Sequence, residues 1–162
     1  LAGKNNGTTT NAGVEGGNVT GQGDYVGGLV GTNGRNGTIR EAFSTGNITG
    51  NKNVGGLVGG QNGGTIQQAY ATGDVMGQDT VGGLVGTNGN HVSGTIKQVY
   101  ATGNVTGKNN RVGGLVGDMS NGNISNAFAL NGNVTGSSNV GKAFGTKGSN
   151  ARATNITAIS TM

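Results

Sequence analysis

Cysteine, proline and tryptophan are absent from this chain of 162 residues, which has only three tyrosines and three phenylalanines. Without cysteine, the chain has no disulfide framework, no thiolate metal site and no cysteine nucleophile. No apolar run approaches the ~18 residues that a membrane-spanning helix needs, so we expect no membrane insertion. No signal-peptide pattern is visible and the first residue is Leu1, so we expect a processed chain or a piece of a longer one.

Charged residues are also few, with ten lysines and arginines against six acids and a net charge of +4. The cations are spread without a basic run, which favours a solvated surface over a nucleic-acid interface. His91 is the only histidine, and one histidine without cysteine does not make a usual zinc site. Asp74 and Asp79 are the one nearby pair suited to acid–base chemistry, but no acid recurs from repeat to repeat. We therefore predict no catalytic residues, no metal site and no cofactor.

Glycine, in contrast, supplies 38 of the 162 residues. A glycine-rich chain of low hydrophobicity is expected to be disordered unless its glycines recur with a fixed period. They do recur, because the hexapeptide Val-Gly-Gly-Leu-Val-Gly occurs at 26–31, 54–59, 81–86 and 112–117, with a degenerate copy at 140–145. The structural residues of this repeat are Gly27, Gly28, Leu29, Gly55, Gly56, Leu57, Gly82, Gly83, Leu84, Gly113, Gly114 and Leu115.

A second repeated block lies between the hexapeptides, at 38–50, 65–77, 95–107 and, in a looser form, 123–136. Each unit of about 28 residues holds three pieces rich in Val, Ile, Thr and aromatic residues, separated by Gly-Asn turns. Length differences collect at fixed points, as they do at the corners of a repeating coil. The pattern predicts an all-β, three-sided β-solenoid (β-helix) with four full coils plus partial end coils, and essentially no helix.

The predicted solenoid is a single repeat domain over residues 1–162. It comprises a partial coil at 1–25, coils that begin at 26, 54, 81 and 112, and a degenerate coil at 140–162. Alternation along the second block predicts Ala42, Ser44, Gly46 and Ile48 pointing inward and Phe43, Thr45, Asn47 and Thr49 pointing outward. The glycine repetition indicates two closely opposed sheet faces with no room for side chains. Phe43, Tyr70, Tyr100 and Phe128 would then form an aromatic ladder.

The outward positions also predict a polar ladder on one face. Its members are Asn18, Thr20, Asn47, Thr49, Asn104, Thr106, Asn133 and Thr135, interrupted at Asp74 and Met76. A flat threonine array is typical of β-solenoids that bind ice, and a polar ladder also suits a glycan. The same Asn-x-Thr triplets are N-glycosylation sequons, which in a chain this rich in Asn and Thr we interpret as a result of composition.

The residues also support a resemblance to a known family. The Gly-Gly-Leu-Val-Gly core, together with Tyr-Ala-Thr-Gly-Asn-Val-Thr-Gly at 100–107, resembles the GLUG-motif repeat over roughly residues 17–145. The last copy departs from the motif at Lys142, Ala143 and Phe144, so the final coil is expected to be distorted or to act as an end. The family occurs in secreted or surface bacterial proteins such as filamentous haemagglutinin-like adhesins. The resemblance therefore implies an extracellular stalk, spacer or adhesive role without an active site.

The predicted function is therefore a non-catalytic extracellular structural β-solenoid. No capping unit is evident at either end of the repeat, so we expect end-to-end self-association into a fibre, or else a stalk within an adhesin. A host or matrix surface is a possible partner. The alternative prediction is a ligand-binding module that uses the outer Asn/Thr ladder for ice or glycan.

Overall fold

The computed structural model of the chain describes residues 2–89 and 91–159, and these residues form 20 strands and no helix. The 10-stranded sheet follows the order β1 (Ala2–Asn5), β5 (Val30–Asn33), β9 (Val58–Gln61), β13 (Val85–Asn88), β17 (Val116–Ala129), β14 (Gly94–Ala101), β10 (Thr65–Ala71), β6 (Thr38–Ser44), β2 (Thr8–Val14), with β20 (Phe144–Ala158) paired to β17. This sheet is called sheet A below.

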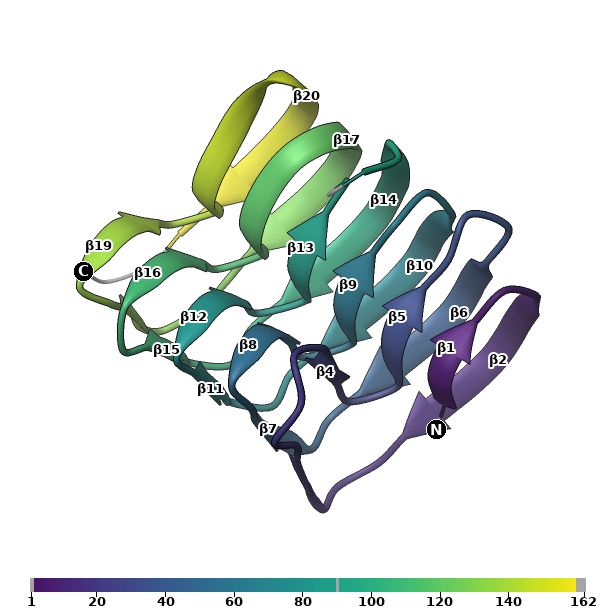
Figure 1. Cartoon of the computed structure of the whole chain (residues 1–162), viewed down its shortest axis with the longest axis horizontal. Helices are drawn as coiled ribbons and strands as arrows, with labels where there is room; N and C mark the ends of the chain where they lie inside the picture. The colour runs from purple at the N-terminus through teal and green to yellow at the C-terminus, as the bar shows by residue number, and fades with distance from the viewer. Residues whose placement is uncertain (1, 90, 160–162) are drawn as a thin grey trace.

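Two five-stranded sheets complete the fold. Sheet B has the order β18 (Val134–Thr135), β15 (Val105–Gly107), β11 (Val75–Gly77), β7 (Asn47–Thr49), β3 (Asn18–Thr20). Sheet C has the order β19 (Ser138–Gly141), β16 (Asn110–Gly113), β12 (Asp79–Gly82), β8 (Lys52–Gly55), β4 (Val26–Gly27). The chain therefore winds as a parallel β-solenoid with three sheets, as the sequence predicted, and its first and last coils lie at opposite ends of the stack (Figure 1).

Three repeats contribute four strands each, β4 (Val26–Gly27) to β7, β8 to β11 and β12 to β15, rather than the three pieces that the sequence indicated. The hexapeptide divides between two strands, because β8 ends at Gly55 and β9 begins at Val58 on a different sheet. The bend falls at Gly56 and Leu57. Among the described strands, only β17 and β20 run unbroken through the following corner, which lies between the end of the hexapeptide and the second block. They therefore join the half of sheet A that holds β5, β9 and β13 to the half that holds β6, β10 and β14.

The repeats stack in strict register. Val26, Val54, Val81, Val112 and Val140 are successive Cα partners down sheet C. Equivalent residues therefore form columns along the solenoid axis, and a property of one coil is repeated in the next coil.

A left-handed residue turns each coil in the middle of the second block. The non-glycine residues with positive φ in this column are Asn11, Glu41, Gln68, Gln98, Asn126 and Asn155. At Glu41 this conformation (φ 52°) places both Ile39 and Ala42 on the inside, although strict alternation would put them on opposite faces of the strand. Beyond this corner the predicted alternation holds, with Ala42, Ser44 and Ile48 buried.

The interior is divided into two hydrophobic clusters. The larger includes Leu29, Leu57, Leu84 and Leu115 from the hexapeptides, all fully buried. The smaller is almost entirely valine, with Ile48 from β7. Between the two clusters the opposite walls nearly touch: a Cβ added to Gly56 would lie 2.8 Å from the Ala71 Cβ and closer still to the Gly83 carbonyl oxygen. The interior is therefore narrowest at the second glycine of the hexapeptide, where a side chain has no room. This narrowing is called the waist below.

Candidate functional site

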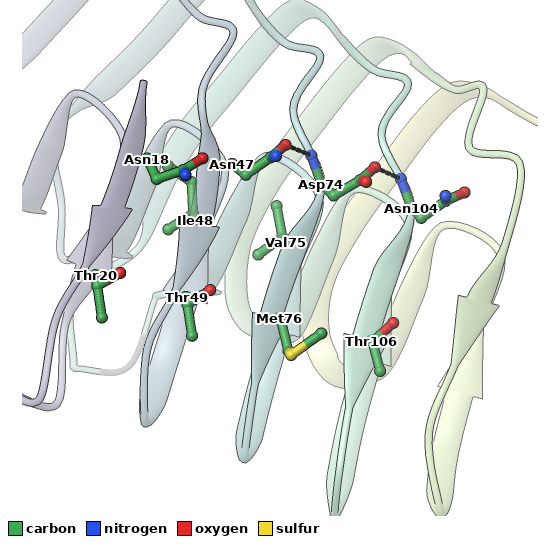
Figure 2. Close-up of a pocket in the computed structure, with 10 residues that line it drawn as sticks. All are labelled: Asn18, Thr20, Asn47, Ile48, Thr49, Asp74, Val75, Met76, Asn104 and Thr106. Atoms are coloured by element: carbon green, nitrogen blue, oxygen red, sulfur yellow. Dashed lines mark hydrogen bonds between the residues drawn. The ribbon is translucent and has the colours of Figure 1, made fainter. Parts of the chain in front are cut away.

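The predicted polar ladder lies on the outer surface of sheet B. In each Asn/Asp-x-Thr/Met triplet of this sheet the middle residue points inward, so that Ile48 is buried while Asn47 and Thr49 are exposed. The strands pair in register and align Thr20, Thr49, Met76, Thr106 and Thr135 in one row. Asn18, Asn47, Asp74 and Asn104 follow a second row beside it (Figure 2), which Asn133 continues through its contact with Asn104.

These two rows border a shallow hollow of about 460 Å³. Four coils contribute to it, from Asn18 and Thr20 in the first to Asn104 and Thr106 in the fourth (Figure 2). Its polar groups are amide, hydroxyl and a single carboxylate. The surface can therefore form hydrogen bonds along the solenoid axis, but it holds no pair of acids for proton transfer.

The asparagine row already uses its side-chain oxygens between coils. The backbone N–H of Asp74 donates to Asn47 Oδ1 (2.9 Å), and the N–H of Asn104 donates to Asp74 Oδ1 (2.8 Å) (Figure 2). The N–H of Asn133 donates to Asn104 Oδ1 (3.1 Å). Aspartate fits this row at position 74 because only an acceptor oxygen is required there. The row therefore fastens one coil to the next.

In the threonine row, the Thr135 hydroxyl donates to Thr106 Oγ1 at 3.4 Å. Met76 is 49% exposed and stands between Thr49 and Thr106 in this row. A ligand that matches a regular hydroxyl array would meet a thioether at the centre of the row.

The acids do not gather into a reactive group. Asp74 borders the hollow on sheet B, whereas Asp79 begins β12 on sheet C, where Asn109 Nδ2 donates to its Oδ2 (3.2 Å). Asp118 pairs with Arg111 at 3.2 Å and accepts hydrogen bonds from the hydroxyls of Ser120 and Thr146. The Asp118 contacts with Arg111 and Thr146 join β17 to β16 and to β20.

Residues 2–89 and 91–159 contain no group of three His, Asp or Glu side chains placed to hold a metal ion. Within the same part of the chain, no helix is long and apolar enough to cross a membrane.

An internal amide ladder was missed by the sequence analysis. Asn33, Gln61 and Asn88 occupy the last position of β5, β9 and β13, are fully buried, and share one register column with Asn5. Asn5 Nδ2 donates to Asn33 Oδ1 (2.9 Å), and Asn33 Nδ2 donates to Gln61 Oε1 (2.8 Å). The available signal was an amide residue three positions after the second valine of the hexapeptide in three successive copies.

The predicted aromatic ladder exists and faces outward. Phe43, Tyr70, Tyr100 and Phe128 are successive partners on sheet A. The rings of Phe43 and Tyr70 stack at 5.4 Å between centroids, and those of Tyr70 and Tyr100 at 4.8 Å. Partial burial raises the pKa of the Tyr100 phenol, and the nearby Tyr70 raises it further. The described ring stacking ends at Tyr100, and Phe128 is 47% exposed.

Fold and surface together define a parallel β-solenoid whose side-chain ladders mostly connect one coil to another. A sequence model of the family described as the GLUG motif matches residues 22–49, 50–76 and 77–106, which together exceed half of the chain. The chain therefore belongs to the GLUG motif family, and the predicted resemblance is confirmed. Among curated proteins and solved structures, no significant match is found.

Proposed function

We propose that this chain is a non-catalytic structural rod, serving as the stalk of an extracellular adhesin-like protein or as the subunit of a fibre. The observation that carries the proposal is the register of the coils. Backbone pairing, two continuous cores and separate amide, aromatic and Asn/Asp ladders all run along the same axis. A stack of this kind resists bending and sets a distance, as a spacer must.

The ends of the rod support its extension by further coils. Core residues are only partly covered there: Ala12, Val14 and Val19 at one end, and Val140, Ala143, Phe144, Ala153, Ile156 and Ala158 at the other. A sheet that ends with unpaired strands and half-covered apolar side chains favours the addition of another strand layer. In a stalk this layer is more of the same polypeptide, and in a fibre it is another copy.

An extracellular location rests on the family. GLUG repeats are known from secreted bacterial proteins, and a spacer role suits the outside of a cell.

Negative-stain electron microscopy of the purified chain at neutral pH tests the proposal directly. Fibres of uniform width would identify a fibre subunit, and short single rods would identify a stalk segment. Deletion of residues 1–16, which removes β1 and β2, should abolish fibres and leave a folded monomer. Fibres that persist after this deletion would contradict end-to-end assembly, and globular or irregular particles from the intact chain would contradict the rod itself.

A ligand-binding role for the outer Asn/Thr ladder is the second candidate, supported by the hollow along sheet B. Two observations favour the structural role over it: the asparagine oxygens already accept bonds from the neighbouring coil, and Met76 interrupts the hydroxyl row. Replacing Thr49 and Thr106 by bulky residues should abolish ice or glycan binding if this face recognises either. Unchanged binding after that replacement would remove the candidate.

A further inference from the structure

The buried amide ladder has a direction. Three side-chain hydrogen bonds link coils in this column, and in each the earlier coil donates and the later coil accepts: Asn5 to Asn33, Asn33 to Gln61, and Asn88 to the Met119 sulfur. Between Gln61 and Asn88 the column is interrupted, because Gln61 Nε2 donates to the Gly64 carbonyl. The first coil ends the column with Asn5, whose Oδ1 accepts hydrogen bonds from the Gly7 backbone N–H (3.3 Å) and the Thr9 hydroxyl (3.4 Å). The last coil should end it with a donor.

Lys147 occupies that last position. It is the Cα partner of Met119 and so continues the column of Asn33, Gln61 and Asn88. Lysine is a donor with three N–H groups and no acceptor, which agrees with the direction of the ladder. Unlike the amides above it, Lys147 is exposed and charged. A charged residue at an inward position of an edge strand is a known device that limits strand addition.

The end coils also differ in charge. Residues 2–25 contain Lys4 against Glu15 and Asp24, a net charge of −1, whereas residues 138–159 contain Lys142, Lys147 and Arg152 without any acid, a net charge of +3. Like ends therefore repel at the basic coil, and unlike ends attract.

From these observations we propose that the first coil of a second copy docks on the last coil as the next layer of the solenoid, which brings Lys147 beside Asn5 of that copy. The inference rests on the rod-like function proposed above and names its partner as a second copy of this chain. Continuing the observed register places Ala2 of the second copy beside Phe144, Ala12 beside Ile156, and Val14 beside Ala158. The half-covered apolar residues of both ends are then buried together.

Lys147 makes this junction weak and reversible. A lysine buried against a neutral amide loses hydration that the contact only partly replaces. Substitution by a neutral amide keeps a polar side chain beside Asn5 and removes the cost of burying a charge. The junction should therefore tighten in Lys147→Asn and Lys147→Gln, and it should fail in Asn5→Lys, where two ammonium groups would meet.

Sedimentation velocity over a range of concentrations, on the full chain and its variants, tests the inference. We expect Lys147→Asn and Lys147→Gln to associate about tenfold more tightly than the parent chain, and Asn5→Lys to stay monomeric. Lys108→Asn is the matched control, because it makes the same charge change on an exposed corner away from the ends and should associate like the parent.

Three results would overturn the inference: no association by any variant, equal association by all of them, or tighter association in the Lys108→Asn control alone. Thermal unfolding of each variant shows whether it is folded, and Lys147→Gln provides a second test should Lys147→Asn fold poorly. Folded single rods that never associate would refute this junction while leaving the stalk function intact, whereas loss of the rod shape would refute the proposed function itself.

Discussion

Asn47 accepts, through Oδ1, a hydrogen bond from the backbone amide of Asp74 one coil further on, at 2.9 Å. The contact joins a side chain to the backbone of the next repeat, so its usefulness depends on the stack rather than on a ligand. Asp74 plays the same part for Asn104. The Asn/Asp row, which the sequence suggested as a recognition surface, therefore connects neighbouring coils.

If this row only needs acceptor oxygens, Asp74→Asn should leave the free energy of unfolding within about 0.5 kcal/mol of the parent value, as for most surface substitutions. Asn104→Ala removes the acceptor for the Asn133 N–H and should cost about 1 kcal/mol. Urea denaturation monitored by circular dichroism measures both. Equal losses for the two variants would show that the Asp74 carboxylate contributes more than one acceptor oxygen.

The waist predicts a sharp difference between two glycines. Gly56→Ala would place a methyl group against Ala71 and the Gly83 carbonyl, and should destabilise the chain by about 3 kcal/mol through overpacking. Gly23→Ala is the matched control, because a Cβ there meets no atom within 4 Å. Midpoints of thermal unfolding compare the two. A Gly56→Ala variant as stable as Gly23→Ala would contradict the close approach of the two walls.

Removing one member of the buried amide ladder should be costly. Asn33→Ala leaves the buried Gln61 Oε1 without its donor and removes one of the two acceptors of Asn5 Nδ2, and should destabilise the fold by about 2–3 kcal/mol. Asn36→Ala, on an exposed corner three residues away, provides the comparison and should change little. Denaturant titration of the pair measures the difference, and similar midpoints would argue against a structural ladder.

The stacked tyrosines predict a response at high pH. The folded-state pKa of Tyr100 is raised, so the folded chain keeps a proton that the unfolded chain has released. Stability should therefore be intact below the ordinary tyrosine pKa of about 10 and should fall as the pH rises above it. Ultraviolet titration of tyrosinate measures the pKa. In Tyr70→Phe the Tyr100 pKa should decrease, since a neighbouring phenolate is lost, whereas an unchanged titration would contradict this coupling.

The exposed threonine row should tolerate bulky residues if the chain is purely structural. Thr49→Tyr combined with Thr106→Tyr should leave the unfolding midpoint and the sedimentation behaviour close to those of the parent, because both side chains point away from the core. Loss of association in this double variant would place a contact surface on sheet B and would contradict assembly through the ends.

Much of the solenoid could be predicted because its coils repeat. The spacing of the hexapeptides predicts parallel columns, and the inward positions of Ala42, Ser44 and Ile48 follow from alternation. The division of the hexapeptide between two sheets could not be predicted, since Gly56 and Leu57 carry no sign of a bend beyond the glycine itself. The left-handed corner at Glu41 also gave no signal, because non-glycine residues seldom adopt that conformation.

The amide ladder shows the same limit at the candidate site. Asn33 and Gln61 are polar and lie next to a glycine-rich turn, where sequence reasoning expects exposed loop residues. They are buried because each finds its partner in the adjacent coil, 28 residues away. The outer Asn47 was predicted to be exposed, and it is, but its bond to Asp74 was not foreseen.

The sequence by itself determined the repeat length, the β-class of the fold, the family and the absence of cysteine chemistry, because these depend on composition and on spacing along one chain. Only the tertiary structure decided which polar residues are buried, where the two walls meet and which groups the ends present. Those properties depend on contacts between coils, and a hydrogen bond or a clash between residues some 28 positions apart exists only once the coils are stacked in register.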